Sequence, residues 1–262
     1  MRMQNLIKTG QWMFAIGMAG LGLLGIVYKD FIIGRPPAWP KEIDFNPILA
    51  YICSVVTIGA AIALVINKKP VIAACIIAFL ILILSVSRHI PFFDPDQLNA
   101  YKSLALFGGA LIIACSFIET NVFVMPEFIR KNKTQSNIIF IGCLSLAAFF
   151  ILAGYAHFKF ADFVNQFIPS YIPFHPFWTY CCGICLIAGG IGLTLPQTRK
   201  WAAFFSGIMI TGWFLLLHIP RFFANMQDAS DRMGLFESFA FAGVCFCLAG
   251  MCAKKRMQLT DR

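Results

Sequence analysis

The chain has 262 residues, of which 59% are hydrophobic and 13% are charged, and its mean hydropathy is +0.77. Soluble domains average about 45–50% apolar and about 25% charged residues, so this composition excludes a soluble globular fold and a disordered one. A helix that spans a bilayer needs about 20 apolar residues, so the chain has room for roughly eight such helices. No sizeable soluble domain fits beside them.

Runs without Asp, Glu, Lys or Arg predict where the chain crosses the membrane. In chain order these runs predict helices at about 10–28, 47–67, 70–87, 103–118, 137–156, 176–196, 201–218 and 237–253. The runs are apolar on all sides, as expected for helices immersed in lipid. The expected fold class is therefore an all-α integral membrane protein with eight transmembrane helices.

The loops between these helices predict the orientation, because cytoplasmic loops are rich in Lys and Arg. The basic residues on one side are Arg2, Lys8, Lys68, Lys69, Arg130, Lys131, Lys133, Arg199, Lys200, Lys254, Lys255, Arg256 and Arg262. The acidic residues on that side are Glu119, Glu127 and Asp261. This side, with both termini, is expected in the cytoplasm of a bacterial cell, and the helices in its inner membrane. The net charge of +9 is thus explained by the basic residues of the cytoplasmic loops, and no nucleic-acid partner is expected.

The two halves of the sequence resemble each other. A single offset aligns these pairs through three helices: Gly25 with Gly154, Phe31 with Phe160, Pro40 with Pro169, Phe45 with Phe174, Pro47 with Pro176, Tyr51 with Tyr180, Cys53 with Cys182, and His89-Ile90-Pro91 with His218-Ile219-Pro220. After an insertion in the second copy, Lys102-Ser103 aligns with Glu237-Ser238. We therefore expect two tandem four-helix bundles, residues 1–133 and 134–262. A pseudo-two-fold axis along the membrane normal would relate them.

A long link follows the first helix of each copy, from Lys29 to Pro47 and from His157 to Pro176. Both links are rich in aromatic residues and proline and poor in charge, which suits the headgroup zone of a bilayer. They are expected to lie on the outer surface as interfacial segments or lids.

Several motifs of the second half carry a family resemblance. They are His157 with Phe160, Ile168-Pro169 with Ile172-Pro173, Trp178-Thr179-Tyr180, Ala188-Gly189-Gly190, Leu215-Leu216-Leu217-His218-Ile219-Pro220-Arg221 and Leu235-Phe236-Glu237-Ser238-Phe239-Ala240. Through them, residues 154–252 resemble the DoxX family of small four-helix membrane proteins. The first half resembles a diverged copy, with Tyr28 where the second has His157 and Phe92 where it has Arg221.

The resemblance implies a link to redox chemistry, since some DoxX-like proteins are membrane partners of thiosulfate:quinone oxidoreductases or of oxidative-stress enzymes. The expected function is an accessory subunit of a quinone-linked membrane redox system. The expected partners are the bilayer, subunits of membrane redox enzymes and further copies of the chain. The alternatives are a carrier or channel for a small neutral or apolar solute, and a membrane assembly factor. The sequence has no catalytic motif, and function depends on sites rather than on folds.

The histidines mark the expected ligand site, because all of them fall on the predicted outer side. The candidate ligand-binding residues are His218, Arg221, Glu237, His89, Arg88, Lys102, His157 and His175. In one interpretation each histidine bonds a loop carbonyl and stabilises a helix end. In the other, the polar groups form a pocket for a quinone headgroup, an anionic ligand or a metal. The sequence identifies no cofactor; in the leading interpretation the pocket holds a quinone, whose oxygens would accept hydrogen bonds from His and Arg.

The ten cysteines all fall in or beside predicted spans, where free cysteine packs as a small apolar residue. Cys182 and Cys185 form a Cys-x-x-Cys pair near the start of a helix, a pattern that also occurs in disulfide exchange. They are therefore candidate redox thiols. A zinc site would need a second pair of ligands, so no metal is expected.

Overall fold

The computed structural model describes residues 3–31, 46–90, 93–94, 97–120 and 132–260. Most of the link of the first half, residues 32–45, lies outside this part of the chain, as do Pro91 and Phe92. The expectations made for them are therefore not addressed by the structure.

The described residues form helices joined by short turns. The helices are α1 (Met3–Tyr28), α2 (Asn46–Val65), α3 (Pro70–His89), α4 (Gln97–Thr120), α6 (Asn132–Lys159), α7 (Ala161–Phe167), α8 (His175–Thr194), α9 (Arg199–Trp213), η2 (Phe214–His218), α10 (Ile219–Ala224) and α11 (Ala229–Thr260). The segment η2 is a single turn of π-helix, and it joins α9 to α10 without a break.

Within this part of the chain, eight helical segments are long and apolar enough to cross a membrane. They are Asn5–Tyr28, Pro47–Val65, Pro70–His89, Gln97–Ile118, Lys133–Lys159, His175–Thr194, Arg199–Ala224 and Ala229–Lys254. This confirms the expectation of an all-helical protein that passes the membrane several times.

Several predicted boundaries are wrong by up to two helical turns. The fourth span begins at Gln97 rather than 103, and the last begins at Ala229 rather than 237. The prediction placed the span ends at charged residues, but Lys102 and Glu237 lie within helices and pair with each other. The helix also continues past Pro220, because the π-helical turn η2 carries the chain directly into α10.

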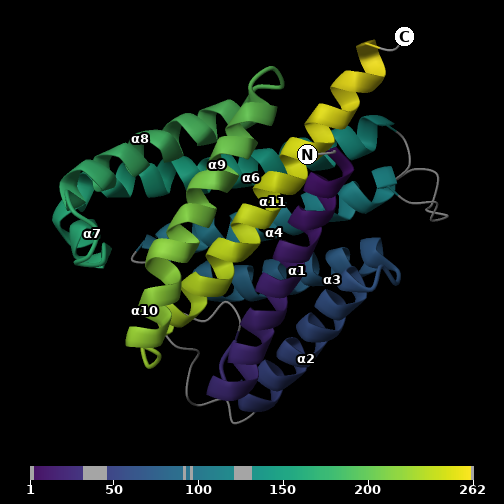
Figure 1. Cartoon of the computed structure of the whole chain (residues 1–262). Helices are drawn as coiled ribbons and strands as arrows, with labels where there is room; N and C mark the ends of the chain where they lie inside the picture. Colours follow the sequence, from purple (N-terminus) through teal and green to yellow (C-terminus); the bar gives the residue numbers. More distant parts are fainter. Residues whose placement is uncertain (1–2, 32–45, 91–92, 95–96, 121–131, 261–262) are drawn as a thin grey trace.

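The packing differs from two separate four-helix bundles. Among the described residues, α1 packs along α11 and α4 packs along α6, whereas α1 has little contact with α4. The helices α2 and α3 extend from one side of this arrangement, and α8 and α9 from the other, while α4 also contacts α11 (Figure 1). The first helix of each half therefore packs on the last helix of the other half, and the halves interlock.

Small residues explain the closest of these contacts. A Cβ atom on Gly10 would lie 2.4 Å from the carbonyl oxygen of Gly243, and one on Gly243 would lie 2.6 Å from the backbone nitrogen of Phe14. Two turns after Gly10 on α1, a Cβ atom on Gly17 would lie 2.7 Å from the carbonyl oxygen of Phe236. The antiparallel helices α1 and α11, side by side in Figure 1, thus approach backbone to backbone, as small residues allow in membranes.

The four histidines lie toward one end of the bundle, which we call the histidine end. The helix α3 ends there with His89, and α8 begins there with His175. The helices α4 and α11 also begin at this end, and each brings a charged residue into its first turns. The candidate site therefore lies at the histidine end.

Candidate functional site

A buried ion pair joins the two halves at the histidine end. Lys102 Nζ on α4 donates to Glu237 Oε2 on α11 at 2.7 Å. The side chains are 13% and 7% exposed, so the pair is largely shielded from solvent. Both residues lie inside candidate membrane spans. Their charges compensate each other, so these two candidate ligand residues are engaged in holding α4 against α11.

His218 lies beside this pair at the end of the π-helical turn. Its ring packs on α11, where a Cβ atom on Gly234 would lie 3.1 Å from Nδ1. The ring is within electrostatic reach of both ion-pair residues, Glu237 and Lys102, and also of Arg221 and Asp231. Single π-helical turns are frequent at functional sites because they reorient a side chain within a continuing helix.

A second ion pair follows one turn later. Arg221 on α10 donates to both carboxylate oxygens of Asp231 on α11, over 2.7 and 2.9 Å, and Asn225 Nδ2 donates to the same carboxylate at 3.1 Å. The Arg221 guanidinium carbon also lies 4.3 Å from the centre of the Phe167 ring. Asp231 is 5% exposed. The positive charge of Arg221 is therefore compensated while its guanidinium still faces the link after α6.

The first-half candidates occupy the corresponding end of α3. Arg88 and His89 are both buried, at 4% and 5% exposure. His89 Nε2 lies 3.3 Å from Ser103 Oγ, next to Lys102 on α4. His89 is thus bonded to a side chain of the neighbouring helix rather than to the loop carbonyl that the helix-end interpretation expects.

The other two histidines bond backbone carbonyls. His157 Nδ1 donates to the carbonyl oxygen of Ala153 in the preceding turn of α6, at 2.7 Å. His175 Nε2 donates to the carbonyl oxygen of Pro169 at 3.2 Å and so ties the start of α8 to the link. The His175 bond is to a loop carbonyl, as in the helix-end interpretation, whereas the His157 bond stays within its own helix. His175 also borders a cleft.

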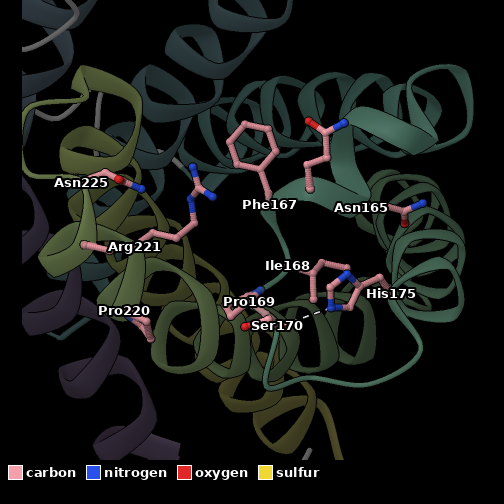
Figure 2. A pocket seen from close by; sticks show the side chains of 11 residues that line it. Asn165, Phe167, Ile168, Pro169, Ser170, His175, Pro220, Arg221 and Asn225 are labelled. Carbon is pink, nitrogen blue, oxygen red and sulfur yellow. Dashed lines mark hydrogen bonds between the residues drawn. The ribbon is translucent and has the colours of Figure 1, made fainter.

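That cleft has a volume of about 620 Å³ and is lined by Asn165, Gln166, Phe167, Ile168, Pro169, Ser170, His175, Pro220, Arg221, Ala224 and Asn225. One wall is α7 with the link that follows, and the opposite wall is α10. In Figure 2 the Arg221 guanidinium points across the opening toward the Phe167 ring, and Asn225 lies on the same side as Arg221. We call this space the polar cleft. Of the eight candidate ligand residues, Arg221 and His175 line it.

An apolar cleft of about 610 Å³ is lined by the next residues of the same link. It is lined by Tyr171, Ile172, Pro173, Phe174, Phe177, Trp178 and Leu216. The Tyr171 hydroxyl donates to the carbonyl oxygen of Leu216. Pro220 has no N–H to donate to this carbonyl four residues earlier, so the link tyrosine satisfies an oxygen that the helix leaves open.

The two candidate thiols have different surroundings. The Cys182 sulfur is buried and accepts a hydrogen bond from the Trp213 indole N–H at 2.9 Å. Cys185 is exposed on α8 and interacts with Cys181, one turn earlier on the same helix. All three thiols are free. The contact between α8 and α9 thus uses Cys182 as a packing residue.

Asp231, Asn165 and Phe167 were missed by sequence reasoning. Asp231 pairs with Arg221, and Asn165 Oδ1 accepts a hydrogen bond of 2.6 Å from the Thr179 hydroxyl. One signal could have found Asp231. It lies ten residues after Arg221, on the far side of the insertion that distinguishes the second half from the first. Nothing local marks Asn165 or Phe167, since each meets its partner from a different helix.

A family model described as "Domain of unknown function (DUF8561)" matches residues 146–232. The match begins within α6 and ends in the first turn of α11, and it contains every residue that lines the two clefts. No curated protein and no solved structure matches the chain. The likeness to the DoxX family stays a prediction.

Proposed function

We propose that this protein is an accessory subunit of a membrane redox system and holds the headgroup of a neutral quinone in the polar cleft. The observation that carries the proposal is the compensated guanidinium of Arg221, which faces a cleft of ligand size. Small-molecule sites typically measure about 300–1,000 Å³ and combine apolar walls with a few placed polar groups. The polar cleft fits this description.

The charge balance favours a neutral ligand over an anionic one. Asp231 already neutralises Arg221, so an anion would have to compete with a buried carboxylate for the guanidinium. A quinone carbonyl does not have to compete with Asp231, because it is neutral and only accepts hydrogen bonds. The guanidinium has five N–H groups, and its bonds to Asp231 use two of them.

Other groups of the cleft complete a quinone-binding arrangement. The amides of Asn165 and Gln166 and the hydroxyl of Ser170 are donors on the wall opposite Arg221. The Phe167 ring, already in contact with Arg221, offers a face for the quinone ring. In this proposal His218, Lys102 and Glu237 position α10 and α11 rather than touch the ligand.

Binding of a tailless benzoquinone headgroup analogue tests this proposal. The double variant Arg221→Met/Asp231→Leu removes the donors and their counter-charge together, so no buried charge is left unpaired. Loss of a hydrogen bond from a charged donor costs about 1.5–3 kcal/mol, so we expect the Kd to rise roughly tenfold to a hundredfold in calorimetric titrations.

Lys200→Met serves as the matched control, because Lys200 stacks on Trp201 at the opposite end of the spans. This variant should bind the analogue like the wild type. An unchanged Kd in Arg221→Met/Asp231→Leu, or the absence of binding to the wild-type protein, would contradict the proposal.

The interlocked packing supports the proposal that the two halves are tandem copies related by a pseudo-two-fold axis. Exchanging α1 with α6, α2 with α8, α3 with α9 and α4 with α11 maps each main helix contact onto another one. Lys102 and Glu237, which occupy equivalent positions in the repeat, meet at the α4–α11 contact. A symmetric dimer of one half would place like charges there, whereas the tandem chain can place opposite ones.

The proposed location is the bacterial inner membrane with both termini in the cytoplasm, on the strength of the basic loops opposite the histidine end. A green fluorescent protein fused after Arg262 should fluoresce, because it folds in the cytoplasm, and alkaline phosphatase fused at the same place should be inactive. A dark fluorescent fusion with an active phosphatase fusion would reverse the orientation and place the clefts inside.

The carrier alternative receives less support from the packing. A solute path along the seam between the halves would pass α4 and α11, but a Cβ atom on Gly109 would lie 2.8 Å from the Val244 side chain. These helices are therefore in close contact at that level. Uptake of a neutral solute into liposomes that contain the purified protein would favour the carrier function over the proposed one.

A further inference from the structure

The polar and apolar clefts share two parts of the chain. Both are lined by residues of the link between α7 and α8 and by residues of the helix that runs from η2 into α10, and each also uses the first turn of α8. The polar cleft uses Ser170 of the link and Pro220 of the helix, while the apolar cleft uses Tyr171 and Leu216. The Tyr171 hydroxyl donates to the Leu216 carbonyl, so this hydrogen bond joins the two parts at the apolar cleft, one residue after Ser170 and four residues before Pro220.

The apolar cleft presents hydrocarbon groups to a ligand and leaves no side-chain donor available for a hydrogen bond. Its side-chain polar atoms are bonded within the protein: the Tyr171 hydroxyl to Leu216, and the Trp178 indole N–H to the Pro173 carbonyl at 3.1 Å. What remains are aromatic faces, a proline ring and aliphatic chains. Such a surface recognises a chain of methylene or isoprene groups and does not recognise a polar ligand.

The position in the fold matches that chemistry. Trp178 and Leu216 lie in the candidate spans His175–Thr194 and Arg199–Ala224, near the ends that face the link. Phe174 and Phe177 are 78% and 60% exposed beside them. Exposed aromatic rings at helix ends are typical of the boundary between headgroups and lipid tails. An apolar tail could therefore reach the cleft from the bilayer.

We propose that the apolar cleft holds the hydrocarbon tail of the ligand whose headgroup occupies the polar cleft. This inference rests on the proposed function and adds to it that the ligand is an amphiphile, with a neutral acceptor headgroup and an isoprenoid or alkyl tail. Tyr171 separates the two parts. Its ring packs against the tail, while its hydroxyl fixes the link to η2.

Two analogues with one headgroup test the inference: the tailless benzoquinone and decylubiquinone, which carries a ten-carbon tail. Calorimetric titrations use the full chain in lipid nanodiscs, and empty nanodiscs provide the blank for partition of the tail into lipid. A methylene that moves from water into the cleft strengthens binding roughly fourfold, whereas one that moves from lipid into the cleft gains much less. We expect decylubiquinone to bind at least about tenfold more tightly than the tailless analogue, because part of the tail stays in lipid.

A matched pair of variants locates the tail. Leu216→Trp fills the apolar cleft from a side chain that is 50% exposed, while keeping the carbonyl that bonds Tyr171. Leu215→Trp makes the same change at the neighbouring residue, which is 54% exposed and does not line the cleft. Leu216→Trp should abolish the advantage of the tail and leave the tailless analogue unaffected, while Leu215→Trp should change neither.

The outcomes separate the two proposals. If the tailless analogue binds but the tail gives no gain, or the gain survives in Leu216→Trp, the tail inference is wrong and the headgroup site stands. If neither analogue binds to the wild-type protein, the proposed function itself fails. Equal loss of the tail advantage in Leu215→Trp and Leu216→Trp would also overturn the inference, since it would point to a general disturbance of η2.

Discussion

Lys102→Glu is expected to destabilise the folded protein by about 3–5 kcal/mol, the usual result of removing one partner from a buried ion pair. The variant would leave Glu237, whose side chain is 7% exposed, opposite a second carboxylate at the α4–α11 contact. The free energy of unfolding can be measured by titration of the purified protein from mild detergent into sodium dodecyl sulfate. Glu237→Lys should have a similar effect, because it places two ammonium groups together.

The double variant Lys102→Glu/Glu237→Lys restores a complementary pair with its direction reversed. We expect it to recover most of the lost stability, so that the two single changes are strongly non-additive. Lys200→Glu is a control at the opposite end of the spans and should change stability by less than about 1 kcal/mol. Single variants as stable as the wild type, or a double variant no better than either, would mean that the pair does not hold the halves together.

Gly10→Ala is expected to weaken the contact between α1 and α11. The new Cβ atom would lie 2.4 Å from the carbonyl oxygen of Gly243, which is backbone and cannot move aside without displacing a helix. Forcing extra atoms into a close-packed contact typically costs about 1–3 kcal/mol. Gly243→Ala should act in the same way, and both variants should lower the unfolding free energy and the yield of monodisperse protein.

Two other helical glycines provide matched controls. A Cβ atom on Gly59 or on Gly212 would meet nothing within 4 Å. Gly59→Ala and Gly212→Ala should therefore be neutral or stabilising, by up to about 1 kcal/mol, because alanine favours the helix. If Gly10→Ala and Gly59→Ala have equal effects, the close approach of α1 and α11 is not what stabilises the bundle.

The number and type of the spans could be predicted because they depend on local composition alone. A run of apolar residues long enough to cross a bilayer has few alternatives to a helix there. The ends of the spans could not be predicted in the same way. Lys102 and Glu237 look like loop residues in the sequence, but each finds its partner on a helix far along the chain. The interlocking of the halves depends on such long-range contacts too.

The candidate site was predicted in part. The sequence indicated the histidine end of the bundle, and it named Arg221 and His175, which line the polar cleft. His218 and Glu237 were named for the same reason but lie at the packing of η2 and α4 on α11. Charged residues and histidines in the sequence of a membrane protein indicate where polar side chains gather. They do not indicate which of these side chains bond one another. Neutral donors such as Asn165 carry no signal of this kind.

If the polar cleft holds a quinone, the quinone should copurify with the protein in mild detergent and appear in an organic extract measured by mass spectrometry. We expect a near-stoichiometric amount, enriched over the bulk membrane and lost from Arg221→Met/Asp231→Leu. An extract with the quinone content of bulk membrane, the same for wild type and variant, would contradict the proposal.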